Sequence, residues 1–111
     1  MSSTTKRLAG PAYIGSSAAD ILAAPASGSK YVVGHIHVAN KDSSARTFSM
    51  YLGATGASAG GTELFKDKEV GIGDTFDYYC MLEMTSSDYL SGIASAANAL
   101  VVTIEGEKSY L

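Results

Sequence analysis

The segment YVVGHIHVAN, Tyr31–Asn40, is the longest β-branched run in the chain and decides the fold. One side of its two-residue period is apolar and carries Val32, Ile36 and Val38, with Gly34 between them. The other side is more polar and carries Tyr31, Val33, His35, His37 and Ala39. This pattern predicts a strand that packs one face against a core. Turn-forming residues bound the strand at 25–29 and at 40–44.

Stretches with the same alternation lie along the rest of the chain, separated by turns rich in Gly, Ser, Asn and Asp. We expect strands at residues 8–15, 20–24, 31–40, 46–53, 63–70, 75–82, 89–95 and 100–107. No stretch has the period of an amphipathic helix of three turns. The sequence therefore predicts an all-β fold, an antiparallel β-sandwich of the jelly-roll type with seven or eight short strands. The expected core residues are Val32, Ile36, Val38, Phe48, Met50, Leu52, Phe76, Ile93, Val102 and Ile104.

The length of 111 residues suits one domain with one core. Residues 1–7 are polar and lack a period, so we expect an N-terminal arm that is disordered or laid over a neighbouring subunit. Residues 8–111 form the single β-sandwich domain of this prediction. Residues 54–61 are rich in Gly, Ala and Ser, and we expect them to form an exposed flexible loop.

Charged residues are scarce, at 17% of the chain against about 25% in an average soluble domain. This low charge suits packing against other subunits, with a compact, weakly charged monomer as the alternative. The net charge is −3 and the basic residues are scattered, so we expect no nucleic-acid partner. No apolar run approaches the roughly 18 residues of a membrane helix, so we expect no membrane partner either.

Two histidines are the sharpest candidates for chemistry. His35 and His37 point to the same face of the predicted strand, about 6.6–7 Å apart along it. Imidazoles at this spacing can share a metal ion, as in cupins, but the cupin pattern also needs a nearby Glu and a third His. Residues 39–62 contain no Glu, and the chain has no third His. We therefore expect no metal site and no cofactor, and interpret the pair as polar residues on a sheet face or at an interface.

Motifs for catalysis are also missing from the sequence. It contains no Gly-x-Ser-x-Gly elbow and no phosphate-binding loop, so we expect no catalytic residues and no enzyme. Solvation of loops explains four neighbouring carboxylates, although an acidic calcium site is the alternative. These carboxylates are Asp67, Glu69, Asp74 and Asp77. The single cysteine, Cys80, lies in an aromatic segment that favours a buried, inert thiol.

Tyrosines placed away from the predicted core point to an interface. Such tyrosines are common between subunits, where the ring is buried and the hydroxyl stays hydrogen-bonded. The alternative is ordinary sheet-surface tyrosine covered by loops. With the two histidines, the candidate subunit-interface residues are Tyr31, His35, His37, Tyr51, Tyr79 and Tyr89.

Several of these segments resemble small structural proteins of tailed bacteriophages. In that group, an apolar strand ending in Val-x-Asn precedes a Thr-Phe strand, a Gly-rich loop and a Leu-Phe strand. An Ala-rich segment and Val-Thr-Ile-x-Gly close the chain. Here the matching parts are Tyr31–Asn40, Thr47–Gly53, Leu64-Phe65 and Ile93–Glu107. The resemblance implies a virion structural protein and no catalytic residues.

From this resemblance we expect a non-enzymatic virion protein made in the bacterial host cytoplasm, most simply a capsid decoration or cement protein on the particle surface. A minor tail or tail-tip protein is the alternative, as is a carbohydrate-binding β-sandwich for host attachment. The expected partners are further copies of the chain, as a homo-oligomer, and the major capsid protein or tail proteins. Analogy with decoration proteins suggests a trimer.

Overall fold

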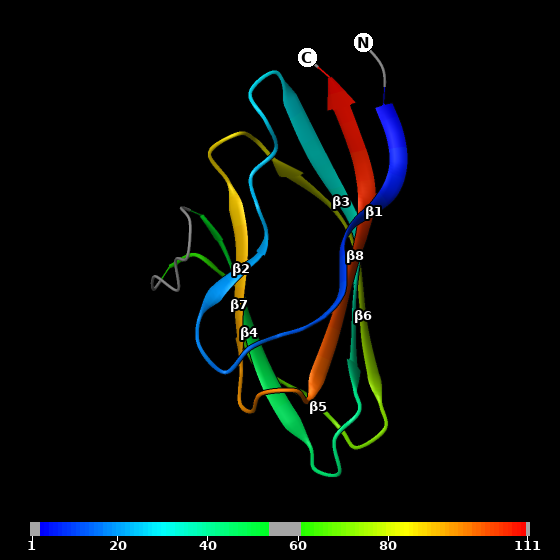
Figure 1. The fold of residues 1–111 in the computed structure, drawn as a ribbon, viewed down its shortest axis with the longest axis vertical. Helices are drawn as coiled ribbons and strands as arrows, with labels where there is room; N and C mark the ends of the chain where they lie inside the picture. The colour runs from blue at the N-terminus through cyan, green and yellow to red at the C-terminus, as the bar shows by residue number, and fades with distance from the viewer. Residues whose placement is uncertain (1–2, 54–60, 111) are drawn as a thin grey trace.

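A computed structural model describes residues 3–53 and 61–110 as eight strands in two layers (Figure 1). The strands are β1 (Ser3–Tyr13), β2 (Ala19–Leu22), β3 (Ser29–Asn40), β4 (Arg46–Gly53), β5 (Glu63–Val70), β6 (Thr75–Met84), β7 (Tyr89–Ala94) and β8 (Leu100–Tyr110). Within these described ranges no helix is long and apolar enough to cross a membrane. The predicted strands are therefore all present, with boundaries shifted by a few residues.

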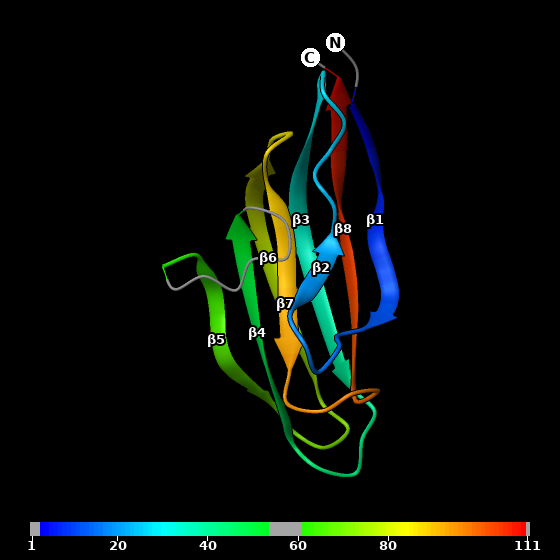
Figure 2. The ribbon, with the colours of Figure 1, turned by 60° about the vertical axis from the view of Figure 1, so that its left-hand side comes forward.

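The two sheets have the strand orders β1-β8-β3-β6 and β2-β7-β4-β5, and every neighbouring pair is antiparallel. Figure 2 shows the sheets as two layers with β1 and β5 at opposite sides of the molecule. This order is that of a jelly roll, in which consecutive strands alternate between the two sheets except for β4 and β5, which pair in one sheet. The predicted fold class is confirmed. β3 lies between β8 and β6, so the segment Tyr31–Asn40 belongs to a central strand.

The core lies between the sheets and is built from alternate residues of the strands. Six of the ten predicted core residues are at most 1% exposed: Ile36, Val38, Phe48, Met50, Val102 and Ile104. Leu52 and Phe76 pack against this cluster as partly buried side chains. The remaining buried members were not predicted, and the largest of them are Ile14, Leu22, Val33, Val70, Met84, Leu90 and Leu100. Burial of these apolar side chains is the main favourable contribution to folding.

A β-bulge at Gly34 changes the alternation of β3. The pairing register shifts between Val33 and His35 against both neighbouring strands. One extra residue inverts which face the following side chains occupy. Val33 is therefore fully buried, and the predictions that Val32 belongs to the core and that Val33 does not are wrong. A Cβ on Gly106 of β8 would overlap the Val32 carbonyl oxygen, so glycine permits the close approach of the strands here.

The prediction for Ile93 is also wrong. In β7, Leu90 pairs with Leu52 and Ala94 pairs with Phe48, and these positions face the core. Ile93 pairs with Ser49 of β4 on the opposite face of the sheet and is half-buried. The apolar character of Ile93 suggested the core, but its parity along the strand decides its face.

Residues 3–7 do not match the predicted arm, because they form the first half of β1. The register runs from Ser3 opposite Ser109 to Arg7 opposite Glu105. Polar residues can form a strand here because β8 supplies backbone partners and the outer side of an edge faces solvent. Residues 54–60 of the predicted flexible loop lie outside the described residues.

Candidate functional site

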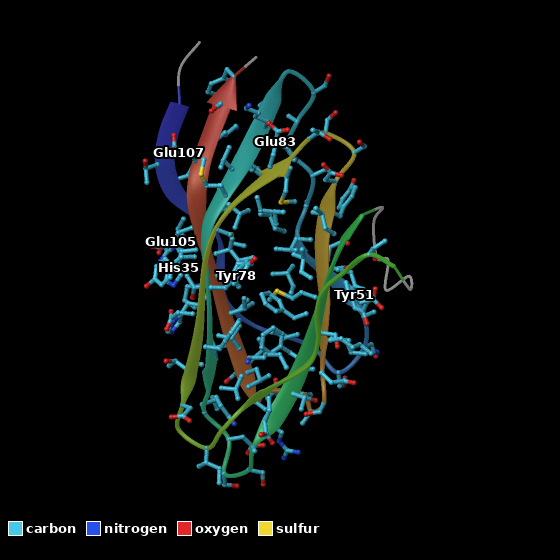
Figure 3. The ribbon with its side chains drawn as sticks, turned by 180° about the vertical axis from the view of Figure 1, so that it is seen from behind. His35, Tyr51, Tyr78, Glu83, Glu105 and Glu107 are labelled. Carbon is cyan, nitrogen blue, oxygen red and sulfur yellow. The ribbon has the colours of Figure 1, made fainter. Side chains whose placement is uncertain are left out.

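The outer face of the β1-β8-β3-β6 sheet gathers polar and aromatic side chains from three strands. His35 of β3 lies between Glu105 of β8 and Tyr79 of β6. His37 lies opposite Asp77 of β6. Side chains on neighbouring strands of one face are about 5 Å apart, so the register alone brings these groups into contact. Figure 3 shows His35 and Glu105 together on this outer face.

The two imidazoles converge on one carboxylate. Nε2 of His35 lies 2.8 Å from Oδ1 of Asp77, and Nδ1 of His37 lies 2.6 Å from the same oxygen. The second ring nitrogen of His35, Nδ1, lies 3.3 Å from Oε1 of Glu105. The ring of Tyr79 stacks on that of His35, with centroids 4.3 Å apart and planes inclined by 3°. Both nitrogens of the His35 ring are therefore hydrogen-bonded, and one face of the ring is covered by Tyr79.

These contacts set the protonation of the cluster. Burial lowers the pKa of His35, but hydrogen bonds and attraction to Asp77 and Glu105 outweigh it, so the pKa is raised above its usual value. Hydrogen bonds from His37 and then His35 hold the pKa of Asp77 below its usual value. Asp77 is thus a carboxylate that accepts from both rings. The side chains of His35, His37 and Asp77 are 22%, 36% and 35% exposed, so solvent and ions reach them.

Asp77 offers a third possible metal ligand beside the two histidines, which the cupin-type spacing considered above does not include. One donor atom from each of His35, His37 and Asp77 lies within 4.8 Å of the others. Sequence spacing did not reveal this, because Asp77 joins the pair only through the pairing of β3 with β6. Asp67, Glu69 and Asp74 form no comparable group among the residues that the structure describes.

The six predicted interface residues separate into three groups. His35, His37 and Tyr79 lie together on the outer face of one sheet, and Tyr79 is 74% exposed. Tyr31 packs against the core, because the bulge at Gly34 places it on the face opposite to His35. The prediction that Tyr31 points away from the core is wrong.

Tyr51 and Tyr89 lie on the outer face of the other sheet, as their pairing with Ser91 and Gly53 shows. Figure 3 places Tyr51 in the layer opposite to His35. Tyr51 is only 5% exposed, so the expectation of an exposed ring is wrong for this residue. Tyr89 is half-buried. Neither residue is part of the cluster around His35.

Met81 is the most exposed of the large apolar residues that the structure describes, and the sequence analysis did not single it out. It lies on β6 two positions after Tyr79, on the same outer face, and is 90% exposed. It borders an open depression of about 420 Å³ over the Gly34 bulge. Other residues around this depression include Val32, His35, Glu105 and Glu107. The alternation of β6 would have revealed Met81, because every second residue from Asp77 points outward.

Cys80 lies between these outward residues and points toward the core. Its Sγ–H donates to the Val33 carbonyl oxygen at 3.2 Å, and burial raises the pKa of the thiol. The thiol is therefore mostly protonated at neutral pH and is a poor nucleophile. This agrees with the inert thiol predicted above, although the side chain is only half-buried.

Comparison with known proteins finds likeness in structure alone. No family model and no curated protein matches the sequence. The chain is similar to a protein of the Bacillus endospore appendages, a family of disulfide-linked pili, with TM-score 0.60 and 14% identity over 99% of this chain and 89% of that chain. It is also similar to a chain of infectious bursal disease virus Gx strain, with TM-score 0.45 and 12% identity over 98% of this chain and 32% of that chain. The appendage protein and this chain therefore share a β-sandwich fold.

Proposed function

We propose that this protein is a non-enzymatic structural subunit that assembles with further copies of itself through β6. The observation that carries the proposal is the exposure of two large side chains on one edge strand, Met81 at 90% and Tyr79 at 74%. These two side chains are alternate residues on one face of β6, and an exposed apolar patch of neighbouring side chains is a common mark of an interaction site. The fold that it shares with a pilus protein agrees with a structural role in a virion or an appendage.

The backbone of β6 supports the same proposal. One side of the strand pairs with β3, and the other side is an edge of the sheet. An edge strand presents free N–H and C=O groups, which a strand of another chain can extend. β6 has ten residues and carries few charges, so little opposes such pairing. A strand of a second copy of the chain is therefore a suitable partner for the free edge of β6.

The finer proposal is a place on the particle of a tailed bacteriophage, as a capsid decoration or cement protein. The resemblance of residues 31–40, 47–53 and 93–107 to small phage structural proteins supports it. A trimer bound to the major capsid protein is the proposed state, and a minor tail or tail-tip protein is the alternative. Both assignments rest on resemblance and analogy.

A carbohydrate-binding module is the second candidate, because one observation favours it. Tyr79 is a largely exposed aromatic ring with Asp77 and Glu105 close by through His35. Sugar rings pack on aromatic faces and use carboxylates as hydrogen-bond acceptors. His35 already covers one face of Tyr79, so only the other face is free for a sugar.

Sedimentation velocity at micromolar concentration tests the assembly, with and without purified phage particles. We expect the wild-type protein to sediment as an oligomer or with particles, and Met81→Lys to sediment as a monomer. The matched control is Ile72→Lys, which changes a residue 64% exposed in the turn between β5 and β6, away from the outer face. A wild-type monomer that never sediments with particles contradicts the proposal, and so does equal loss of assembly in both variants.

A further inference from the structure

We propose that His35, His37 and Asp77 bind one divalent first-row transition metal ion, with Zn²⁺ as the best fit. The three residues offer two imidazole nitrogens and one carboxylate oxygen within 4.8 Å of one another. This mixture of nitrogen and oxygen donors suits Zn²⁺ and neighbouring metals better than Mg²⁺ or Ca²⁺, which prefer oxygen alone. Three protein ligands leave a further position open to water or to a partner.

The distances between the donor atoms are close to those of a bound site. Zn²⁺ lies about 2.0–2.2 Å from nitrogen and oxygen ligands, so tetrahedral donors are about 3.4 Å apart. Here Asp77 Oδ1 is 2.8 Å from His35 Nε2 and 2.6 Å from His37 Nδ1. Asp77 Oδ1 must therefore move away from each of these nitrogens by less than about 1 Å to admit the ion. Rotation of the partly exposed His37 and Asp77 side chains is enough for this change.

Glu105 is placed as a second partner for the metal-binding histidine. When Nε2 of His35 binds a metal, the neutral ring keeps its one proton at Nδ1. That N–H faces Oε1 of Glu105 at 3.3 Å. Ligating histidines usually donate their other N–H to a carboxylate or a carbonyl, which fixes the tautomer and the ring orientation. The stacked ring of Tyr79 restrains the same imidazole plane.

Charge favours a cation at this point of the sheet. Asp77 and Glu105 place two carboxylates on either side of one imidazole. A divalent ion balances both charges. Protonation of His35 is the competing arrangement, in which the imidazolium donates to both carboxylates and no metal binds. The two arrangements differ in whether added metal displaces protons from the cluster.

Calorimetric titration of untagged protein with Zn²⁺ is the first test, with the visible absorption of bound Co²⁺ as a second readout. We expect saturable binding of one ion per chain and ligand-field bands for Co²⁺ in a site of low symmetry. Asp77→Asn and His37→Ala should each weaken binding at least tenfold and remove these bands. The matched control is Asp67→Asn, the same chemical change at an exposed position of β5 where asparagine tolerates the positive φ.

A second pair of variants tests the role of Glu105. Glu105→Ala should weaken Zn²⁺ binding by roughly tenfold, as loss of outer-shell partners usually does. Glu107→Ala, two residues further along β8, should leave the affinity unchanged. Circular dichroism confirms that each variant is folded before titration. Absence of saturable binding up to roughly 1 mM Zn²⁺ overturns the proposal, and so does equal affinity in Asp77→Asn and Asp67→Asn. Either result assigns the cluster to the protonated histidine arrangement and leaves the assembly proposal untouched.

Discussion

β5 and β6 are edge strands of the two facing sheets, and their inner sides meet in one aromatic cluster. The ring of Phe65 on β5 lies 5.2 Å from that of Phe76 and 4.9 Å from that of Tyr78, both on β6. Phe48 contacts Phe65 and Phe76 from beneath, at 5.8 Å each. The two strands therefore close the same side of the sandwich with the same kind of contact.

Their exposed surfaces differ. β5 presents a charged run, Lys66 to Glu69, and its register against β4 shifts twice. Charges and irregular pairing are the devices that protect sheet edges from other strands. The outer face of β6 instead presents Tyr79 and Met81, which are largely exposed. The comparison teaches that two edges can share an aromatic cluster inside the sandwich and still differ outside it, since β5 carries the usual protection against strand pairing and the outer face of β6 is more apolar.

The largest expected effect on stability comes from disrupting the aromatic cluster that β5 and β6 share. Phe48→Ala removes a ring that is 1% exposed and supports both strands. We expect a loss of about 3–5 kcal/mol in the free energy of unfolding, because a buried aromatic side chain is replaced by a cavity. Urea denaturation followed by circular dichroism measures the loss. Phe65→Ala, at a half-buried position, should cost less, and a loss below about 1 kcal/mol for Phe48→Ala would contradict this account.

The opposite edge of the β6 sheet offers a second test. Deleting residues 2–7 removes the part of β1 that pairs with residues 105–109 of β8. We expect the free energy of unfolding to fall by about 2 kcal/mol, since a few backbone hydrogen bonds contribute roughly 1 kcal/mol each. Thermal melting of the truncated protein checks this. Lys6→Ala with Arg7→Ala is the control, because it keeps the backbone pairing and should change little. An unchanged melting temperature after deletion would restore the interpretation of these residues as an arm.

The sequence predicts the strands of this fold well, because alternation and turn residues are local signals. It does not predict the face of Val33 or Tyr31, since a bulge at Gly34 depends on how β3 fits against β6 and β8. A glycine within a strand is compatible with a bulge but does not require one. Because the bulge is missed, the residues that precede Gly34 in β3 are assigned to the wrong face of the sheet.

The candidate site shows the same limit. His35 and His37 are visible in the sequence, because their spacing places them on one strand face. Asp77 and Glu105 become their partners only when the strand order β8-β3-β6 is known. For Tyr51 the sequence predicted the correct face of the strand but not the burial of the ring. The local sequence pattern predicts on which face of a strand a side chain lies, and the pairing of strands decides which side chains lie beside it.

The smallest expected effect on stability comes from making β5 resemble β6. Lys66→Val with Lys68→Val removes two exposed cations from the protected edge. The free energy of unfolding should change by no more than about 1 kcal/mol, mainly because Lys68 loses its contact over the Phe76 ring at 5.1 Å. Association should nevertheless increase with concentration, since an edge with fewer charges accepts another strand. Light scattering across a concentration series measures this.

The control is Lys108→Val on β8, which pairs on both sides and offers no edge. Equal association in the double variant and this control would mean that added apolar surface, rather than the edge position, drives the contact.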